Sequence, residues 1–282
     1  MKKTLKKIGC TALAVCSLAV SAFGLTSCTT DRPEVQMQLS FNGETYTLEY
    51  TLYRKYAPNT VNHFLKLVEN KYYDGLCIHD YTEDDMYTGA YSYDTNSEEP
   101  GYLVYKPYFE TVAAYKDFPT SVWTAAAEPE KTYYLYGEFE ENDFSVANDG
   151  KFLARDFGAL TMYYTDKGDD FYEQVKVKKV SDGKFATKEY KYCSATSRFS
   201  ISLEKRAYDP EYCTFATLNN TEVLEELIAD IEAHTESAGV FTTGVMVEVD
   251  EDDAYVGNEG LKEYYSIPES PIVINYIKVN KY

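Results

Sequence analysis

The chain of 282 residues is large for one domain and small for two, so a single domain with insertions is the economical interpretation. It carries 46 acidic and 27 basic residues, and loss of the first 27 residues, which hold four of the lysines and no acidic residue, would leave a formal charge of −23 in place of −19. So acidic a surface repels phosphate backbones and anionic headgroups, which excludes nucleic-acid binding and requires any membrane attachment to come from a lipid.

The N-terminus has the pattern of a secretory signal peptide over residues 1–27. Met1 to Lys7 carries four lysines, and Ile8 to Leu25 is uncharged and made of small and apolar residues. Leu25-Thr26-Ser27-Cys28 then has the form of a bacterial lipobox, in which the cysteine is acylated and becomes the mature N-terminus. A plain signal peptide, or a short membrane anchor with Cys28 incidental, is the alternative.

This pattern predicts a protein of the bacterial cell envelope that is lipid-anchored and extracytoplasmic, with a polar tether over residues 28–34. Three further cysteines follow, Cys77, Cys193 and Cys213, without CxxC spacing. We expect these three cysteines to be buried thiols. One disulfide bond between two of them is the alternative. The three histidines do not cluster with carboxylates at metal-ligand spacing, so neither a metal nor a cofactor is expected.

A β-hairpin is predicted over Val35 to Leu52. Apolar residues alternate with polar ones on both sides of Asn42-Gly43, a preferred two-residue turn. An amphipathic helix follows over Pro58 to Asn70, because proline suits a first helical turn and Val61, Phe64, Leu65 and Val68 form one apolar stripe. Leu76 and Ile78, after a Tyr72–Gly75 turn, indicate a buried strand.

The stretch from Tyr56 to Tyr81, YAPNTVNHFLKLVENKYYDGLCIHDY, resembles the first helix and following strand of the cyclophilin-type peptidyl-prolyl cis-trans isomerases. Four later blocks resemble that family in the same order. They are Gly137–Phe144, Gly158–Met162, Ser194–Ile201 and Tyr208–Phe215. The resemblance covers residues 35–282 and implies a mostly β fold, a closed antiparallel barrel with two flanking helices.

Two insertions interrupt the resemblance, at about residues 82–131 and 165–192. The first is acidic and rich in tyrosine, and we expect little regular structure there and a position over the barrel. The second contains a predicted hairpin over Gln174 to Tyr192 that turns at Asp182-Gly183. A strand is predicted over Tyr133 to Phe139, between the two.

The second flanking helix is predicted over Thr221 to His234, where the apolar residues again repeat with a helical period and Asn219 or Asn220 can cap the first turn. Two strands, Val240–Val249 and Ile272–Val279, are predicted to close the chain, with the acidic loop Asp250–Gly260 between them.

The resemblance also implies a reaction and a site. Prolyl isomerisation requires an apolar slot for the proline ring and a hydrogen-bond donor to the prolyl nitrogen in the transition state. Asp80 stands where the family has its catalytic arginine, and Thr88 stands where it has a glutamine that holds the substrate backbone. A carboxylate cannot donate, so no catalytic residue is assigned.

The implied substrate groove keeps part of the family pattern. Met86, Met162 and Phe199 match it, whereas Ser200 replaces a phenylalanine, Tyr208 a leucine, Tyr212 a histidine and Arg198 a second glutamine. Arg198 is either a surface cation paired with a carboxylate or a donor that rescues catalysis in place of the missing arginine.

Two functions from different classes remain open, together with a third that has weaker support. The first is an isomerase homologue, weak or inactive, that acts on proline-containing segments of exported proteins. The second is a cyclophilin-fold module that binds peptide or protein without turnover. The third, a glycan-binding surface lipoprotein, has only the abundance of tyrosine in its favour.

Overall fold

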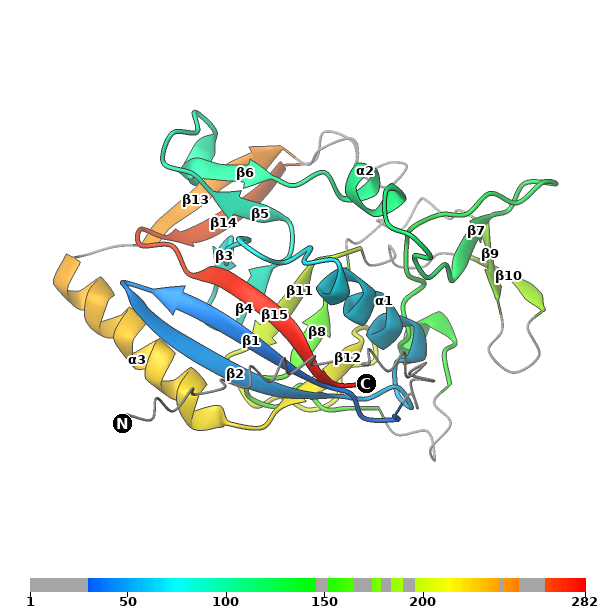
Figure 1. The fold of residues 1–282 in the computed structure, drawn as a ribbon, viewed down its shortest axis with the longest axis horizontal. Coiled ribbons are helices and arrows are strands. Elements are labelled where there is room, and N and C mark those ends of the chain that lie inside the picture. Colours follow the sequence, from blue (N-terminus) through cyan, green and yellow to red (C-terminus); the bar gives the residue numbers. More distant parts are fainter. Residues whose placement is uncertain are drawn as a thin grey trace, which may run out of the picture.

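The computed structural model describes residues 30–145, 152–164, 174–178, 184–189, 196–238, 241–248 and 262–282. The predicted signal peptide and lipobox therefore lie outside the described residues. Within them the fold is mostly β, with one curled sheet of eight strands in the order β15-β1-β2-β12-β8-β11-β4-β3 (Figure 1). No helix of this described part is both long and apolar enough to cross a membrane.

The strands of the main sheet are short, and all of their pairings are antiparallel. They are β1 (Glu34–Phe41), β2 (Glu44–Leu52), β3 (Asp80–Tyr81), β4 (Asp85–Thr88), β8 (Leu160–Met162), β11 (Phe199–Ser202), β12 (Thr214–Leu218) and β15 (Val273–Lys281).

The predicted N-terminal hairpin is confirmed as β1 and β2, which pair from Glu34↔Thr51 to Phe41↔Glu44 without a register shift. Both residues of its turn have a left-handed backbone, with φ of 51° at Asn42 and 89° at Gly43. That geometry matches the twist of the two strands, which explains why asparagine and glycine occupy the turn.

The two edges of the curled sheet approach each other just before β3. Gly75 N–H donates to Ile274 O at 2.8 Å, Ile274 N–H to Leu76 O at 2.7 Å, and Ile78 N–H to Ile272 O at 2.9 Å. The predicted buried segment at Leu76 and Ile78 thus contacts β15 through its backbone. The strand ladders themselves form a curled half-barrel, and a fully closed barrel stays a prediction.

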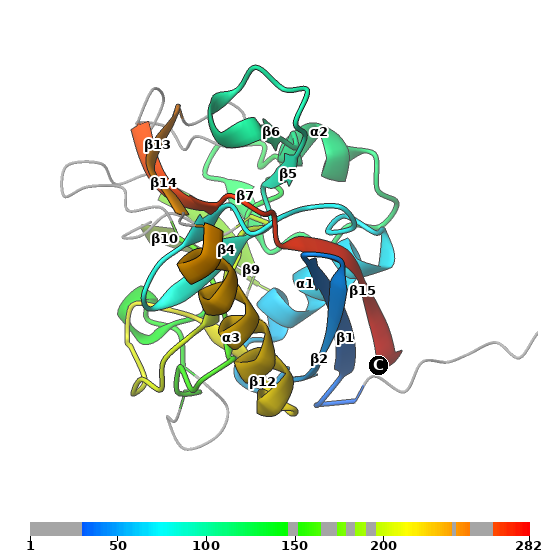
Figure 2. The same cartoon turned by 90° about the vertical axis from the view of Figure 1, so that its left-hand side faces the viewer.

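Both predicted flanking helices are confirmed, as α1 (Pro58–Glu69) and α3 (Thr221–Ala238). α3 lies along β2, where the Tyr46 hydroxyl donates to Asp230, and α1 lies next to β15 (Figure 2). Asn220 precedes α3 and is held by β2, since its amide oxygen accepts from Glu49 N–H at 2.8 Å.

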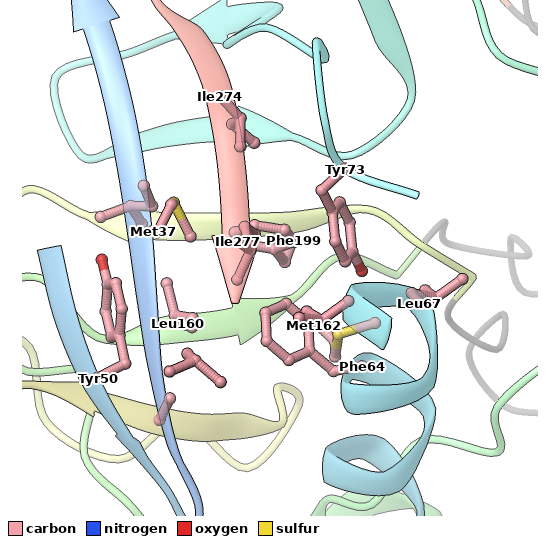
Figure 3. Close-up of a cluster of buried hydrophobic side chains, with 14 of the residues drawn as sticks. Met37, Tyr50, Phe64, Leu67, Tyr73, Leu160, Met162, Phe199, Ile274 and Ile277 are labelled. Carbon is pink, nitrogen blue, oxygen red and sulfur yellow. The ribbon is translucent and has the colours of Figure 1, made fainter. Parts of the chain in front are cut away.

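One hydrophobic core fills the space between α1 and the sheet (Figure 3). Phe64 of α1 lies at its centre, with ring centroids 5.3 Å from Tyr73, 5.6 Å from Phe199 and 5.2 Å from Phe215. The labelled side chains of β1, β8, β11 and β15 converge on the same volume.

The first insertion has more regular structure than predicted. Besides β4 it contains β5 (Tyr91–Tyr93), a 3₁₀ turn η1 (Pro100–Tyr102), β6 (Leu103–Tyr105), a third helix α2 (Tyr108–Ala113) and β7 (Val122–Thr124). The alternation of buried and exposed residues in this insertion cannot be seen in the sequence, because tyrosine occupies both buried and exposed positions. Tyr91 and Tyr108 are buried, whereas Tyr102 is 47% exposed.

The strand predicted over Tyr133 to Phe139 is wrong, because this segment forms no strand and leads into a 3₁₀ turn, η2 (Glu140–Asn142). The physical reason is that Leu135, Tyr136, Glu138 and Phe139 are all buried, which a half-exposed strand with alternating faces cannot achieve.

The hairpin of the second insertion is confirmed in its strands, β9 (Gln174–Lys178) and β10 (Phe185–Glu189), while its turn lies outside the described residues. β9 also pairs with β7, and this small sheet projects to the right in Figure 1.

At the C-terminus the predicted strand over 240–249 is β13 (Phe241–Glu248). It pairs with β14 (Lys262–Pro268), a strand that was not predicted from the sequence. The acidic loop between them is not described. Cys77 and Cys213 are buried free thiols, as expected, and Cys193 lies outside the described residues.

Candidate functional site

Strand register divides the predicted site residues between two faces of the sheet. Asp80 pairs with Tyr87, Tyr87 with Ser200, and Ser200 with Thr161, so these four side chains form one row on the outer face. The neighbouring row faces the core, because side chains alternate along each strand. Phe199 lies in that inner row, opposite both Thr88 and Met162.

Three predicted groove residues therefore lie in the core. Met86 and Phe199 are fully buried and Met162 is 1% exposed, and all three belong to the cluster around Phe64. Thr88 is also fully buried, and its hydroxyl donates to Cys77 O at 2.7 Å. That bond joins β4 to the segment before β3, so the threonine has a structural contact at the position where the resemblance implies a substrate contact.

A small cavity of about 40 Å³ lies on the outer face, lined by His79, Asp80, Tyr87, Tyr163, Arg198 and Tyr265. It is large enough for one or two water molecules, since a water needs about 10–15 Å³ of such space, and far smaller than the roughly 300 Å³ at which ligand pockets begin. The structure thus brings together two predicted site residues, Asp80 and Arg198, around a space that is smaller than a ligand pocket.

Arg198 is only 5% exposed and lies among tyrosines. Its guanidinium carbon is 5.7 Å from the ring centroid of Tyr91 and 5.6 Å from that of Tyr163, and Nη1 donates to the Tyr265 hydroxyl at 3.4 Å. These are cation–π distances. The arginine is consequently a buried group held by aromatic rings, not the surface cation that the sequence analysis kept as one of two possibilities.

Asp80 is half-buried, and its Oδ1 accepts from the backbone N–H of Ser266 at 2.7 Å. This bond ties β3 to β14, the strand that was not predicted. The neighbouring His79 is buried edge-on against Tyr91 and Tyr265, with ring centroids 5.0 Å away in both cases. Burial, and then the charge of Arg198, lower the pKa of His79 well below its usual range, so the imidazole is neutral at physiological pH.

Next to the cavity lies an ion network that sequence reasoning missed. Asp85 is 1% exposed and accepts from Arg155 Nη2 at 3.1 and 3.2 Å and from Arg206 Nη2 at 2.6 Å. Arg206 Nη2 also lies 2.9 Å from the Ser202 hydroxyl, on the strand that carries Ser200. Nothing in the sequence links these charges, because the two arginines lie 70 and 121 positions after the aspartate.

The remaining predicted groove residues surround this network. The Arg155 guanidinium lies 4.7 Å from the ring centroid of Tyr212, and Ser200, 2% exposed, is two residues from Ser202. Tyr208 stacks on Phe152 with 4.7 Å between centroids and 7° between ring planes. Burial raises the pKa of both tyrosines, so both hydroxyls are protonated at neutral pH. The outer face therefore carries hydroxyls and paired charges where the resemblance implies an apolar slot.

The chemistry available at this face is hydrogen bonding and charge pairing. Within the described ranges there is no group of three or more metal-ligating side chains. The site thus offers hydrogen-bond donors and acceptors for a polar segment.

Residues 35–249 match the family model of the cyclophilin type peptidyl-prolyl cis-trans isomerases, which covers more than half of the chain. The chain belongs to this family. None of the curated proteins is significantly similar to it in sequence.

Solved cyclophilins are similar to this family member at low identity. A cyclophilin-type peptidyl-prolyl cis-trans isomerase of Cryptosporidium parvum is 15% identical with a TM-score of 0.43, covering 89% of this chain and 99% of that one. The Mimivirus cyclophilin is 14% identical with a TM-score of 0.41, and the match covers 90% of this chain and 91% of that one. The structure of the Cryptosporidium protein in the presence of the dipeptide Ala-Pro is 17% identical with a TM-score of 0.40, and the match covers 88% of this chain and 99% of that one.

Proposed function

We propose that this cyclophilin-family protein is lipid-anchored at Cys28 on the extracytoplasmic side of a bacterial membrane and binds proline-containing segments of exported proteins, with weak or no isomerase activity. The backbone hydrogen bonds of residues 75–78 with Ile272 and Ile274 support closure of its sheet into the family's barrel. The observation that carries the proposal is Asp80, an acceptor at the position of the family's donor, whose carboxylate is bonded to Ser266 and shares a cavity with Arg198.

The expected loss of catalysis follows from what the transition state requires. A donor that acts only in the transition state contributes about 3–4 kcal/mol, by analogy with one oxyanion-hole donor, which corresponds to at least about a hundredfold in rate. Asp80 cannot supply that hydrogen bond. Thr88 is fully buried, and its single hydroxyl hydrogen cannot donate to a substrate backbone without giving up its bond to Cys77 O.

The slot for the proline ring is also changed. A prolyl ring gains affinity by removing apolar surface from water, about 25 cal/mol per Å². Beneath this face lie Ser200 and the buried charged pair of Asp85 and Arg155, with the half-buried Tyr212 beside them. Polar side chains of this kind favour a backbone or polar side chain over a prolyl ring.

A prolyl-peptide isomerisation assay tests the activity. The wild type should show little or no turnover, and Asp80→Arg should raise it because a guanidinium returns to the donor position. If Arg198 rescues catalysis, the wild type will turn over measurably and Arg198→Ala will abolish it. Lys205→Ala is the matched control, since its side chain is 84% exposed and lies outside the cavity. Ordinary rates that Arg198→Ala leaves unchanged would show that the donor lies elsewhere.

The alternative, a module that binds without turnover, is favoured by the same ion network, which leaves a polar face suited to holding a peptide. Titration of proline-containing peptides against the inactive wild type distinguishes the two. Binding without turnover, weakened by Tyr212→Ala, supports the binding module. Absence of binding to any such peptide contradicts both functions.

A further inference from the structure

The segment that follows the proposed anchor is bonded to the body of the protein from its first described residue. Thr30 N–H donates to Tyr282 O at 3.0 Å, and Thr30 O accepts from Arg54 Nη1 at 2.5 Å. Asp31 O accepts from Arg54 N–H at 3.0 Å, and the Asp31 carboxylate pairs with Lys55 at 2.8 Å. Residues 30 and 31 are therefore part of the body and do not act as a free tether.

The chain leaves little distance between anchor and body. Cys28 precedes Thr30 by two residues, and two residues span at most about 7 Å. The headgroup layer on each side of a bilayer is about 5–8 Å thick. An acylated cysteine at the edge of the hydrocarbon thus places Thr30 within or directly above the headgroups.

The surface around Thr30 can be traced from contact to contact. Arg54 joins Thr30 to Asn62 of α1 at 3.1 Å, and Asn62, Lys66 and Glu69 lie on one side of that helix because they are spaced by four and three residues. Glu69 and Lys278 line one shallow groove with Tyr282, whose backbone oxygen returns to Thr30. We call this surface, made of residues 30–34, 54–55, 62, 66, 69 and 278–282, the anchor face.

The charge of the anchor face differs from that of the molecule. Its described cations are Arg32, Arg54, Lys55, Lys66, Lys278 and Lys281, and its anions are Asp31, Glu34 and Glu69, a net charge of +3. The chain without its signal carries −23. The cations are therefore concentrated where the chain meets its anchor, and a basic residue near an anionic membrane contributes about 1 kcal/mol of attraction.

We propose that the anchor face rests directly on anionic phospholipid headgroups, so that the anchor fixes the orientation of the domain as well as its location. This inference rests on the proposed acylation of Cys28. Its consequence is that the site faces away from the bilayer, because β1 and β11 lie four strands apart in the eight-stranded curled sheet. Figure 2 shows this separation, with β1 and the end of β15 on one side and β4 and β14 on the other.

The test measures lysine accessibility in the acylated full-length protein, extracted from bacterial membranes and reconstituted into vesicles. A water-soluble amine reagent and peptide mass spectrometry report on Lys55 and Lys281, whose side chains are each 51% exposed. Lys205, 84% exposed and next to Arg206 of the site, is the control. On vesicles of phosphatidylcholine and phosphatidylglycerol, Lys55 and Lys281 should lose most of their labelling relative to soluble Cys28→Ser, and Lys205 should lose none.

A linker variant separates orientation from anchoring. Insertion of a Gly/Ser segment of about 20 residues between Cys28 and Thr30 adds a root-mean-square reach of about 25 Å. This variant should still sediment with vesicles and regain labelling at Lys55 and Lys281. A wild type that sediments but is labelled as fully as Cys28→Ser overturns the inference and leaves the anchor intact. Protection in cell envelopes but not on vesicles also overturns it, since a protein would then cover the face. A wild type that does not sediment overturns the anchor itself and this inference with it.

Discussion

At the scale of single residues, the buried carboxylate of Asp85 holds two guanidinium groups on the outer face of the sheet. Replacement by asparagine leaves Arg155 and Arg206 without their anionic partner, and breaking a buried pair in this way costs roughly 3–5 kcal/mol. Asp85→Asn should lower the free energy of unfolding by that amount, measured by denaturant titration. Asp84→Asn is the control, because Asp84 is exposed and pairs with Arg206 at 3.8 Å, an interaction worth under about 1 kcal/mol. Equal stability of the two variants would contradict the role assigned to the network.

Glu138 makes the stability depend on pH. Its carboxylate accepts from Asn59 N–H at 3.0 Å and from Thr60 N–H at 2.8 Å, at the start of α1, and it is 2% exposed. Burial raises its pKa from 4.5 to about 7, although the hydrogen bonds from Thr60 and Asn59 lower it. Between these two values the folded state binds the proton more tightly than the unfolded chain does. The stabilisation is therefore fully present below pH 4.5 and is lost as the pH rises through 7.

The corresponding measurement compares the pH dependence of the free energy of unfolding between the wild type and variants. For the wild type, this group should lower the free energy of unfolding by up to about 3 kcal/mol between these pH values, and Glu138→Gln should remove that part of the slope. The exposed Glu130→Gln should keep it. A slope that Glu138→Gln leaves unchanged would show that Glu138 titrates normally in the folded state.

At the scale of elements, two glycines with the same kind of backbone serve different purposes. Gly43, φ +89°, lies in the β1–β2 turn with no atom within 4 Å of an added Cβ. Gly89 follows β4 with φ +102°, and an added Cβ would lie 2.4 Å from Ser197 O and 2.9 Å from Arg198 Cα. The second glycine thus permits the close approach of β4 to the segment that carries Arg198.

Gly43→Ala should cost about 1–2 kcal/mol, the strain of a left-handed alanine. Gly89→Ala should cost that strain and a further ~1–3 kcal/mol, because the clashing atoms belong to the backbone and cannot move aside. Thermal or denaturant unfolding of both variants measures the difference. Similar losses would show that the chain near Ser197 yields more easily than its packing indicates.

Elements whose pattern is local were predicted correctly. The stripe of α1, the stripe of α3 and the alternation around Asn42-Gly43 each lie within one element, so they are visible without a neighbour. The segment over 133–139 was mistaken for a strand because its apolar residues are buried by packing on several sides. β14 was missed because β13, the strand with which it pairs, comes before a long acidic segment.

At the scale of the whole molecule, the proposed anchoring and orientation depend on Cys28, which lies outside the described part of the chain. Cys28→Ser should move the protein from the membrane fraction to the soluble fraction, because a thioether-linked lipid can no longer form at residue 28. Fractionation followed by immunoblotting measures this, with Cys77→Ser as a control that should stay in the membrane fraction. A Cys28→Ser protein that remains fully membrane-bound would contradict the lipid anchor.

The candidate site was predictable only in its chain positions. The order of the blocks located Asp80, Arg198 and Ser200, because matching blocks are a property of the sequence alone. Whether a residue faces the core or the groove depends on strand register, since a shift by one residue reverses the face. Register placed Met86, Met162 and Phe199 in the core and Tyr87 beside Ser200 on the outer face.

The sequence by itself determined family membership, the N-terminal hairpin and the two long helices, because each depends on residues close together in the chain or on the order of the blocks that match the family. The tertiary structure decided which residues far apart in the chain come into contact. It brought Asp85, Arg155 and Arg206 together, buried Arg198 among tyrosines, and fixed Thr30 to the last residue, Tyr282. The physical reason is that a charge in the sequence has no definite partner until folding removes water and limits which groups can reach it.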